Sequence, residues 1–154
     1  MTSPLRDQAL AIMPAELGLT PTRALPNVCA AVMELGFEGG VATLVAVADG
    51  TASLYFSNGG GIIGAGRHDK VRAAAARFLV SAERSLGALA AAADQAAPLS
   101  GHARFFVRTY VGLMTAAAPG EELAGGGHPL SALFFQGHDL VTAIRDASGE
   151  DANG

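Results

Sequence analysis

A glycine-rich stretch, SNGGGIIGAGRH at residues 57–68, has residue types and spacing that could bind a phosphate. Gly59, Gly61 and Gly64 match the pattern G-x-G-x-x-G, in which glycines let the backbone approach a pyrophosphate closely. The dinucleotide fingerprint also requires a parallel strand–helix–strand unit, whereas these glycines follow the second strand of an expected antiparallel hairpin. A Walker loop requires Gly-Lys-Ser or Gly-Lys-Thr, and neither occurs in the chain. We therefore interpret the match to a nucleotide fingerprint as accidental.

A looser anion site at the same place remains an alternative. Backbone N–H groups at the start of the following helix, with Arg67, His68 and Lys70 beside them, could hold an anion without any motif. The competing interpretation is that the glycines let the chain pass from the edge of a sheet onto a helix across its face. The candidate ligand loop consists of Gly59, Gly60, Gly61, Gly64, Arg67 and His68.

The other residues with chemical potential form no recognisable constellation. The four histidines are spread over three segments, and none makes the i, i+4 pair of a helical zinc site. Cys29 is the single cysteine, which excludes an internal disulfide and a multi-cysteine zinc site. Glu121 and Glu122 are adjacent in an expected loop, and neighbouring carboxylates usually point apart. We predict no catalytic residues, no metal and no cofactor.

Composition points to one ordered domain. The chain has 154 residues, half of them hydrophobic and 16% charged, which argues against disorder. The net charge is −4 and the basic residues are scattered, so a nucleic-acid partner is not expected. No apolar run reaches the roughly 18 residues of a membrane span. The N-terminus lacks the features of a secretory signal, so we expect a cytoplasmic protein without membrane attachment.

The pattern of apolar residues and breakers divides the chain into an N-terminal arm, a single domain and a polar tail. The arm is expected at 1–19, the domain at 20–147 and the frayed tail at 148–154. The domain is predicted to contain helices at 26–36, from residue 68 or 69 to 89 and from 129 to 147, with strands at 41–48, 51–57, 103–109 and 113–118 and a glycine-rich loop at 119–128.

Two hairpins define the predicted sheet. Asp49-Gly50 between two β-rich runs favours a two-residue type I′ turn, in which both residues need positive φ. The second hairpin alternates Phe105 with its neighbours, as a half-buried strand does. The expected fold class is α+β, an antiparallel sheet of four to five strands with helices packed on its faces, in the order α-β-β-α-β-β-α.

The segments VCAAVMELGFEGGVATLVAVADGTASLYFS and RFFVRTYVGLMTAA, with the long helix from Asp69 between them, resemble the roadblock / dynein light-chain superfamily of profilin-like proteins. The resemblance covers residues 22 to 147. It implies a five-stranded antiparallel sheet and a homodimer built by the long second helix and the neighbouring edge strand. Members of this superfamily serve as platforms for small Ras-like GTPases or for motor and signalling complexes, generally without catalysis.

A candidate dimer or partner surface follows from these elements. The long helix is rich in alanine, which lets a second helix approach closely, and Phe106 is expected to be exposed on an edge strand. We therefore expect a non-enzymatic, dimeric protein-interaction platform or regulatory module, with a flat apolar face around Phe106 and Met114. The alternative is a small-ligand or anion-binding sensor, or an enzyme, that uses the loop 57–69 and has a deep pocket beside it. The surface residues proposed are Ala75, Arg104, Phe106 and Arg108.

Overall fold

A computed structural model describes residues 4–62 and 64–153 of the chain. Residues 1–3 of the expected arm, Ile63 of the glycine-rich stretch and Gly154 of the tail lie outside the described residues. The strands are β1 (Val28–Phe37), β2 (Gly40–Val47), β3 (Ala52–Phe56), β4 (Gly61–Ile62), β5 (Ala90–Ala91), β6 (His102–Thr109) and β7 (Leu113–Pro119). The α-helices are α1 (Pro4–Leu10), α2 (Asp69–Arg84), α3 (Gly120–Ala124) and α4 (Ser131–Asn153). Short 3-10 helices are η1 (Pro14–Leu17), η2 (Ala65–Arg67) and η3 (Leu86–Ala88).

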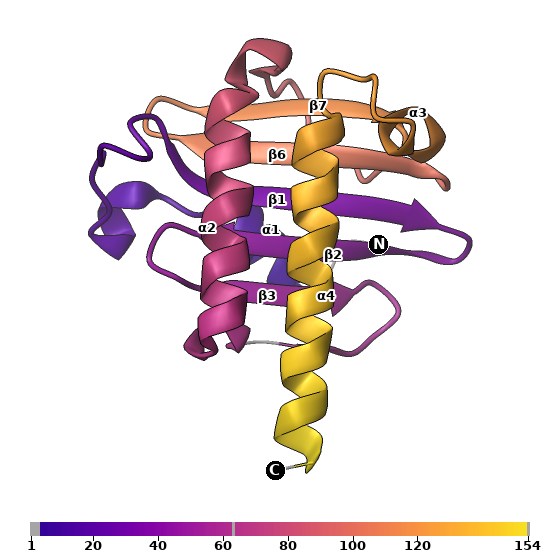
Figure 1. The fold of residues 1–154 in the computed structure, drawn as a ribbon. Helices are drawn as coiled ribbons and strands as arrows, with labels where there is room; N and C mark the ends of the chain where they lie inside the picture. Colours follow the sequence, from indigo (N-terminus) through magenta and orange to yellow (C-terminus); the bar gives the residue numbers. More distant parts are fainter. Residues whose placement is uncertain (1–3, 63, 154) are drawn as a thin grey trace.

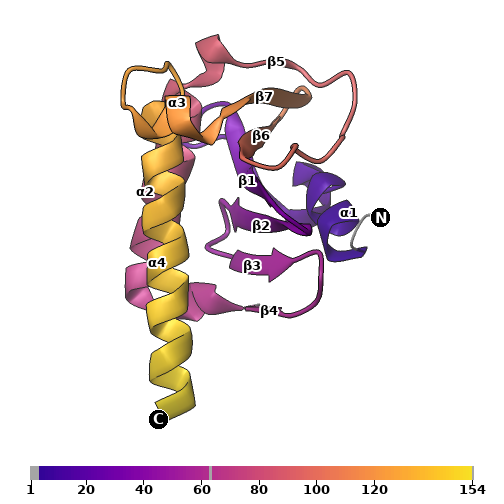
Figure 2. The same ribbon diagram turned by 90° about the vertical axis from the view of Figure 1, so that its right-hand side faces the viewer.

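The described strands form one antiparallel sheet in the order β4-β3-β2-β1-β6-β7-β5. Helices α2 and α4 lie side by side and antiparallel across one face of this sheet (Figure 1). Helix α1 lies against the opposite face, and segment 92–100 passes over the same side next to β6 and β7 (Figure 2). The expected α+β class is confirmed. The sheet has seven strands in place of the expected four to five.

The helix predicted at 26–36 is wrong, because this segment is the central strand β1. The first seven residues of β1 are all buried, as a strand covered on both faces requires. Ala31, Met33 and Leu35 face α2 and α4, while Ala30 and Val32 face α1. The helical spacing in the sequence was a by-product of a run that is apolar on both sides.

The expectation that Arg104 to Thr109 form an edge strand is also wrong. Strand β6 pairs with β1 on one side and β7 on the other. The two edges are instead β4 and β5, strands of two residues each. Such short edges offer little backbone for another chain to pair with.

The Asp49-Gly50 hairpin exists, but its turn differs from the predicted type I′. Gly50 has a φ of 97°, and no described residue other than glycine has positive φ. The N–H of Val47 donates to the carbonyl of Thr51 at 2.9 Å, which closes a loop of three residues. The N–H of Thr51 donates to a carboxylate oxygen of Asp49 at 2.9 Å. This arrangement needs a left-handed residue at Gly50 alone.

Helix α2 begins at Asp69, as predicted, and its buried stripe includes Val71, Ala75, Phe78 and Ala82. It ends at Arg84, five residues before the predicted end at Leu89. The main core lies between α2, α4 and the sheet. A second, smaller core lies between α1 and the opposite face of the sheet.

The terminal segments are more regular than expected. The arm contains α1 and η1, and its residues Arg6 and Leu10 are buried. The loop predicted at 119–128 contains α3. Helix α4 begins at Ser131 and continues through Asn153, into the segment predicted as a frayed tail.

Candidate functional site

The glycine-rich stretch forms a turn from β3 into β4 and then leads into η2 and α2. Gly59 and Gly60 make the turn with φ angles of 110° and 82°. The N–H of Phe56 donates to the carbonyl of Gly60 across it at 3.2 Å. Gly64, with a φ of 77°, immediately precedes η2. Glycine is needed at these positions for backbone conformation, because side chains disfavour positive φ.

Close packing of the backbone explains two further glycines in this stretch. A Cβ atom on Gly66 would overlap the carbonyl oxygen of Gly50, and one on Gly61 would lie 2.7 Å from the Cβ of Tyr55. The side chain of Arg72 donates from Nε to the carbonyl of Gly66 at 3.1 Å. Gly66 thus lets η2 pack closely on the β2–β3 turn, and Gly61 lets β4 lie close to β3. Both contacts agree with the interpretation that the glycines let the chain pass from the edge of the sheet to the helix.

A hollow lies between α2 and α4, on the side of the two helices that faces away from the sheet. We call it the α2–α4 groove; its volume is about 1190 Å³. Of the six candidate loop residues, His68 lines this groove, whereas the four glycines and Arg67 are not among its lining residues. The full lining is His68, Asp69, Lys70, Ala73 and Arg77 from the α2 side and Asp139, Thr142, Ala143, Arg145, Asp146, Ala147 and Gly149 from α4.

Charges of opposite sign border the groove. Lys70 and Arg77 are exposed on α2, and Asp139 and Asp146 are exposed on α4. Among the described residues, no ion pair joins Lys70 or Arg77 to Asp139 or Asp146. Each rim therefore presents charges that are available to a partner.

The predicted partner surface around Phe106 is not a surface in the monomer. Phe106 and Ala75 are 0% and 1% exposed, so the expectation that Phe106 is exposed is wrong. The guanidinium carbons of Arg6 and Arg104 lie 5.8 Å and 4.5 Å from the centroid of the Phe106 ring. Helix α1 and segment 92–100, which follows β5, cover this part of the sheet (Figure 2). Arg104 and Arg108 are partly exposed.

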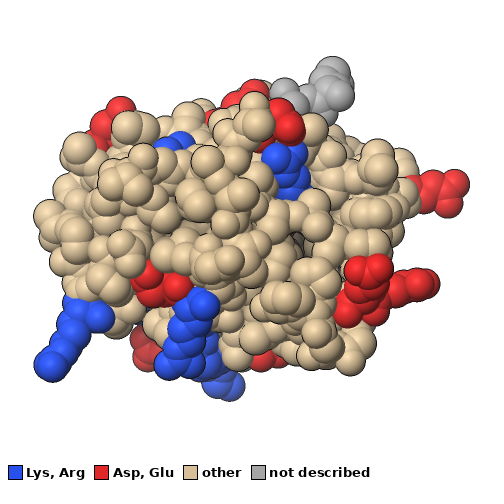
Figure 3. All heavy atoms as spheres, turned by 90° about the horizontal axis from the view of Figure 1, so that it is seen from above, with Lys and Arg blue, Asp and Glu red and all other residues tan. Residues whose placement is uncertain are grey.

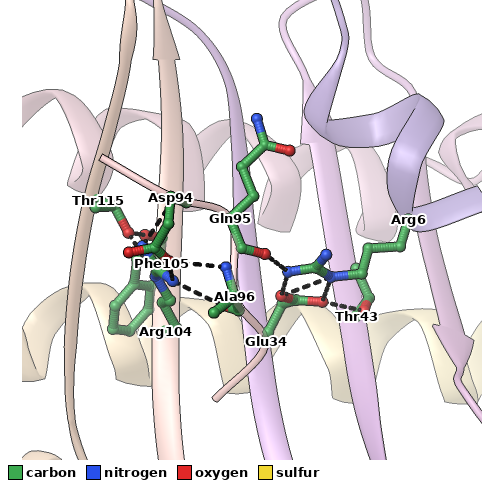
Figure 4. A network of polar contacts seen from close by, with 9 residues as sticks. All are labelled: Arg6, Glu34, Thr43, Asp94, Gln95, Ala96, Arg104, Phe105 and Thr115. Carbon is green, nitrogen blue, oxygen red and sulfur yellow. Dashed lines mark hydrogen bonds and ion pairs between the residues drawn. The ribbon is translucent and has the colours of Figure 1, made fainter. Parts of the chain in front are cut away.

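A buried ion pair holds α1 on the sheet (Figure 4). Arg6 donates from Nε to Oε2 of Glu34 and from Nη2 to Oε1, both at 2.8 Å. Arg6 Nη2 also donates to the carbonyl of Gln95, and the hydroxyl of Thr43 donates to Glu34 Oε2 at 2.7 Å. Both charged side chains are almost fully buried. The pair thereby joins α1, β1, β2 and segment 92–100.

Arg104 holds segment 92–100 in the same way (Figure 4). Its Nη1 donates to the carboxylate of Asp94 and to the carbonyl of Ala96, both at 2.7 Å. Its Nε donates to the hydroxyl of Thr115 at 3.0 Å. The hydrogen bond from Arg104 lowers the pKa of Asp94, and the backbone N–H of Ala96 adds to the effect. Two arginines that project from opposite sides thus fix one covering segment.

The buried charges beneath α1 affect the pKa of Tyr55. Its hydroxyl donates to the carbonyl of Leu5 at 2.9 Å. Burial, and to a lesser extent the carboxylate of Glu34, raise the pKa of Tyr55 to about 12 against the opposing effect of Arg6. Tyr55 therefore stays protonated, and this hydrogen bond persists, throughout the physiological range of pH.

The ion pair between Arg6 and Glu34 was not predicted from the sequence. Glu34 is the only carboxylate within the apolar run VCAAVMELGF. Once that run is known to be a central strand, a buried carboxylate requires a cationic partner. As long as the segment was predicted to be a helix, Glu34 gave no reason to expect a cationic partner, because a glutamate on a helix can face solvent.

No group of three or more His, Cys, Asp or Glu side chains that could hold a metal ion occurs among the described residues. Burial raises the pKa of the Cys29 thiol, and the charge of Arg108 offsets this in part, so the reactive thiolate is disfavoured. Burial lowers the pKa of His138, whose ring lies 4.4 Å from that of Phe134, with Asp139 acting in the opposite direction.

On the face that Figure 3 draws, lysine and arginine lie scattered among uncharged and acidic residues. In the part of the chain that the structure describes, no helix is long and apolar enough to cross a membrane. Comparisons with family models, curated proteins and solved structures found no match to this chain.

Proposed function

We propose that this protein is a non-enzymatic interaction module that forms a homodimer through the α2–α4 groove. The observation that carries the proposal is a groove of about 1190 Å³ with Lys70 and Arg77 on one rim and Asp139 and Asp146 on the other, and no ion pair among these four residues in the described part of the chain. Five further lining residues have small side chains, which let a helix of another chain approach closely. They are Ala73, Thr142, Ala143, Ala147 and Gly149.

The other described surfaces are less suited to a large interface. The outer strands β4 and β5 have two residues each, so strand addition would form few backbone hydrogen bonds. The sheet face beneath α1 is already covered. On the outer side of α2 and α4, no other described helix or strand packs over them (Figures 1 and 2).

The arrangement of charges favours a second copy of the same chain. Because α2 and α4 are antiparallel, the first half of α2 lies beside the second half of α4 (Figure 1). A two-fold axis that lies in the interface and runs parallel to the helices would place α2 of one copy on α4 of the other at the same height. The basic rim of each copy would then face the acidic rim of its partner.

Individual residues fit this pairing. Lys70 would face Asp146 of the second copy, and Arg77 would face Asp139. The two residues that depart from the charge of their own rim, Asp69 and Arg145, would face each other as well. Each pair occurs twice in an isologous dimer, so a single substitution alters two contacts.

Light scattering on the purified protein, combined with one charge reversal, tests the proposal. We expect the wild type to have the mass of a dimer and Arg77→Glu to have the mass of a folded monomer. Arg23→Glu, an exposed arginine remote from the groove lining, is the matched control and should remain dimeric. A wild-type monomer at tens of micromolar would refute the proposal.

The resemblance to roadblock proteins supplies the class of partner for such a dimer, a small Ras-like GTPase or a signalling complex. Within this proposal the module acts in the cytoplasm and has no catalysis of its own. To test this, the wild-type dimer and the Arg77→Glu variant are each immobilised and exposed to cytoplasmic extract, and the proteins that each retains are compared. A GTPase retained by the dimer and lost with Arg77→Glu would support that class, and equal retention by both would exclude a role for the dimer in binding it.

A further inference from the structure

A second cavity lies on the other side of the molecule, between segment 91–95 and the turn that joins β6 to β7. Its volume is about 650 Å³, within the range of small-molecule sites. Val111 is 97% exposed beside it, so the turn from β6 to β7 borders solvent. The apolar lining residues are Ala91, Ala92, Ala93, Val111, Leu113 and Met114.

The cation in this cavity is Arg108, and its hydrogen-bonding capacity is largely unused. Nη2 donates to the carbonyl of Leu10 at 3.2 Å, the one hydrogen bond of this guanidinium within the described residues. Nε is buried and has no acceptor there. Arg6 of α1 and Arg104 of β6 are paired with Glu34 and Asp94, whereas Arg108 of β6 has no carboxylate partner in the described chain.

The acidic residue of the cavity lining already has hydrogen-bond partners elsewhere. Asp94 also lines the cavity, but its Oδ1 accepts hydrogen bonds from Arg104 and from the backbone N–H of Ala96. A guanidinium with free N–H groups beside an apolar cavity matches a carboxylate on an aliphatic tail, because its planar donors pair with two oxygens at once.

We propose that this cavity binds a small aliphatic monocarboxylate. The carboxylate pairs with Arg108, and the tail packs on the alanines of segment 91–93 and on Leu113. A monoanion fits better than a phosphate dianion, since one guanidinium supplies one positive charge and Asp94 lies in the same wall. The site is independent of the α2–α4 groove, with which it shares no lining residue.

Calorimetric titration of the wild-type protein with hexanoate tests this inference, with 1-hexanol and inorganic phosphate as matched probes. Saturable binding of hexanoate at one site per chain, at least tenfold tighter than that of hexanol or phosphate, is the expected result. An absence of saturable hexanoate binding, or equal binding of hexanol, would overturn the proposal. So would tighter binding of phosphate.

Variants locate the site. Arg108→Gln keeps hydrogen-bond donors but removes the charge, and should weaken hexanoate binding at least tenfold. Leu113→Glu places a carboxylate opposite Arg108 in the β6–β7 pairing and should abolish binding by occupying the cation from within the chain. Arg23→Gln and the groove variant Arg77→Glu should bind hexanoate like the wild type. If Arg108→Gln folds and binds hexanoate as tightly as the wild type, Arg108 is not the carboxylate-binding residue and the proposal fails. If that variant does not fold, the comparison of hexanoate, hexanol and phosphate on the wild-type protein tests the proposal.

Discussion

Arg6 in α1 and Glu34 in the centre of β1 form a buried ion pair across 28 residues of sequence, with Nε–Oε2 and Nη2–Oε1 distances of 2.8 Å. This pair fixes the N-terminal helix on the sheet and covers the ring of Phe106. Together with segment 92–100, which Arg104 holds, α1 makes the face predicted to bind a partner an internal surface of the protein.

Removing one member of this pair should destabilise the fold strongly. We expect Arg6→Met to lower the free energy of unfolding by about 3–5 kcal/mol, because it leaves the Glu34 carboxylate buried without a counter-charge. The double variant Arg6→Met/Glu34→Leu should recover most of that loss, since both charges are then gone. Urea unfolding measures both. A loss with Arg6→Met no larger than with the exposed control Arg23→Met would contradict the structural role of the pair.

Phe106 and Phe135 should differ in how much their truncation destabilises the fold. Phe106 is fully buried, and Phe106→Ala should cost about 3–5 kcal/mol of unfolding free energy. Phe135 is 43% exposed on α4, and Phe135→Ala should cost less than about 1 kcal/mol. Thermal or urea unfolding of the two variants provides the comparison, and equal losses would show that the burial pattern is wrong.

The glycine-rich stretch should be sensitive at the position where backbones touch. Gly66→Ala should cost about 3 kcal/mol, because its Cβ would overlap the carbonyl of Gly50 and neither backbone can move freely. Gly64→Ala should cost about 1 kcal/mol, since its positive φ is strained but no atom lies near the added Cβ. Unfolding in urea ranks the two, and a larger effect at Gly64 would argue against close packing as the reason for the glycines.

Much of this fold followed from the sequence, because period and turn chemistry are local properties. The hairpin around Gly50, the buried stripe of α2 and the alternation of Phe105 with Phe106 all appeared in the residue pattern. Strand β1 did not, because a segment buried on both faces loses the alternation that marks a strand.

The candidate sites were less predictable, because they depend on contacts between distant segments. The ion pair of Arg6 with Glu34 and the bond from Arg104 to Asp94 require the sheet order to be known. Strands β4 and β5 have two residues each, too few for a period to appear. The strand that carries Phe106 was therefore wrongly predicted to lie at the edge of the sheet, and Phe106 was wrongly predicted to be exposed.

Stability should decrease in acid partly through Glu83. Burial opposes its ionisation, but hydrogen bonds from the Asn27 side chain and from the N–H groups of Asn27 and Val28 outweigh burial and lower the pKa of Glu83. Its contribution is therefore complete above the pKa of the unfolded chain and is lost as the pH falls through the lowered folded value.

The variant Glu83→Gln isolates this effect. At pH 7 it should lower the unfolding free energy by about 1 kcal/mol, a value reduced by solvent screening. The difference from the wild type should shrink between about pH 5 and pH 3, where the carboxylate becomes protonated. Chemical unfolding over that range is the measurement, with the exposed Glu16→Gln as control. A difference that grows in acid would contradict the sign.

The central claim is that α2 of one copy lies on α4 of another, and a charge exchange tests it most directly. Arg77→Glu and Asp139→Arg should each give a monomer in light scattering, because each places like charges opposite one another twice in the dimer. The double variant Arg77→Glu/Asp139→Arg should regain the dimer mass, since the exchanged charges again face each other. Folded single variants that remain dimeric, or a folded double variant that stays monomeric, would contradict the account.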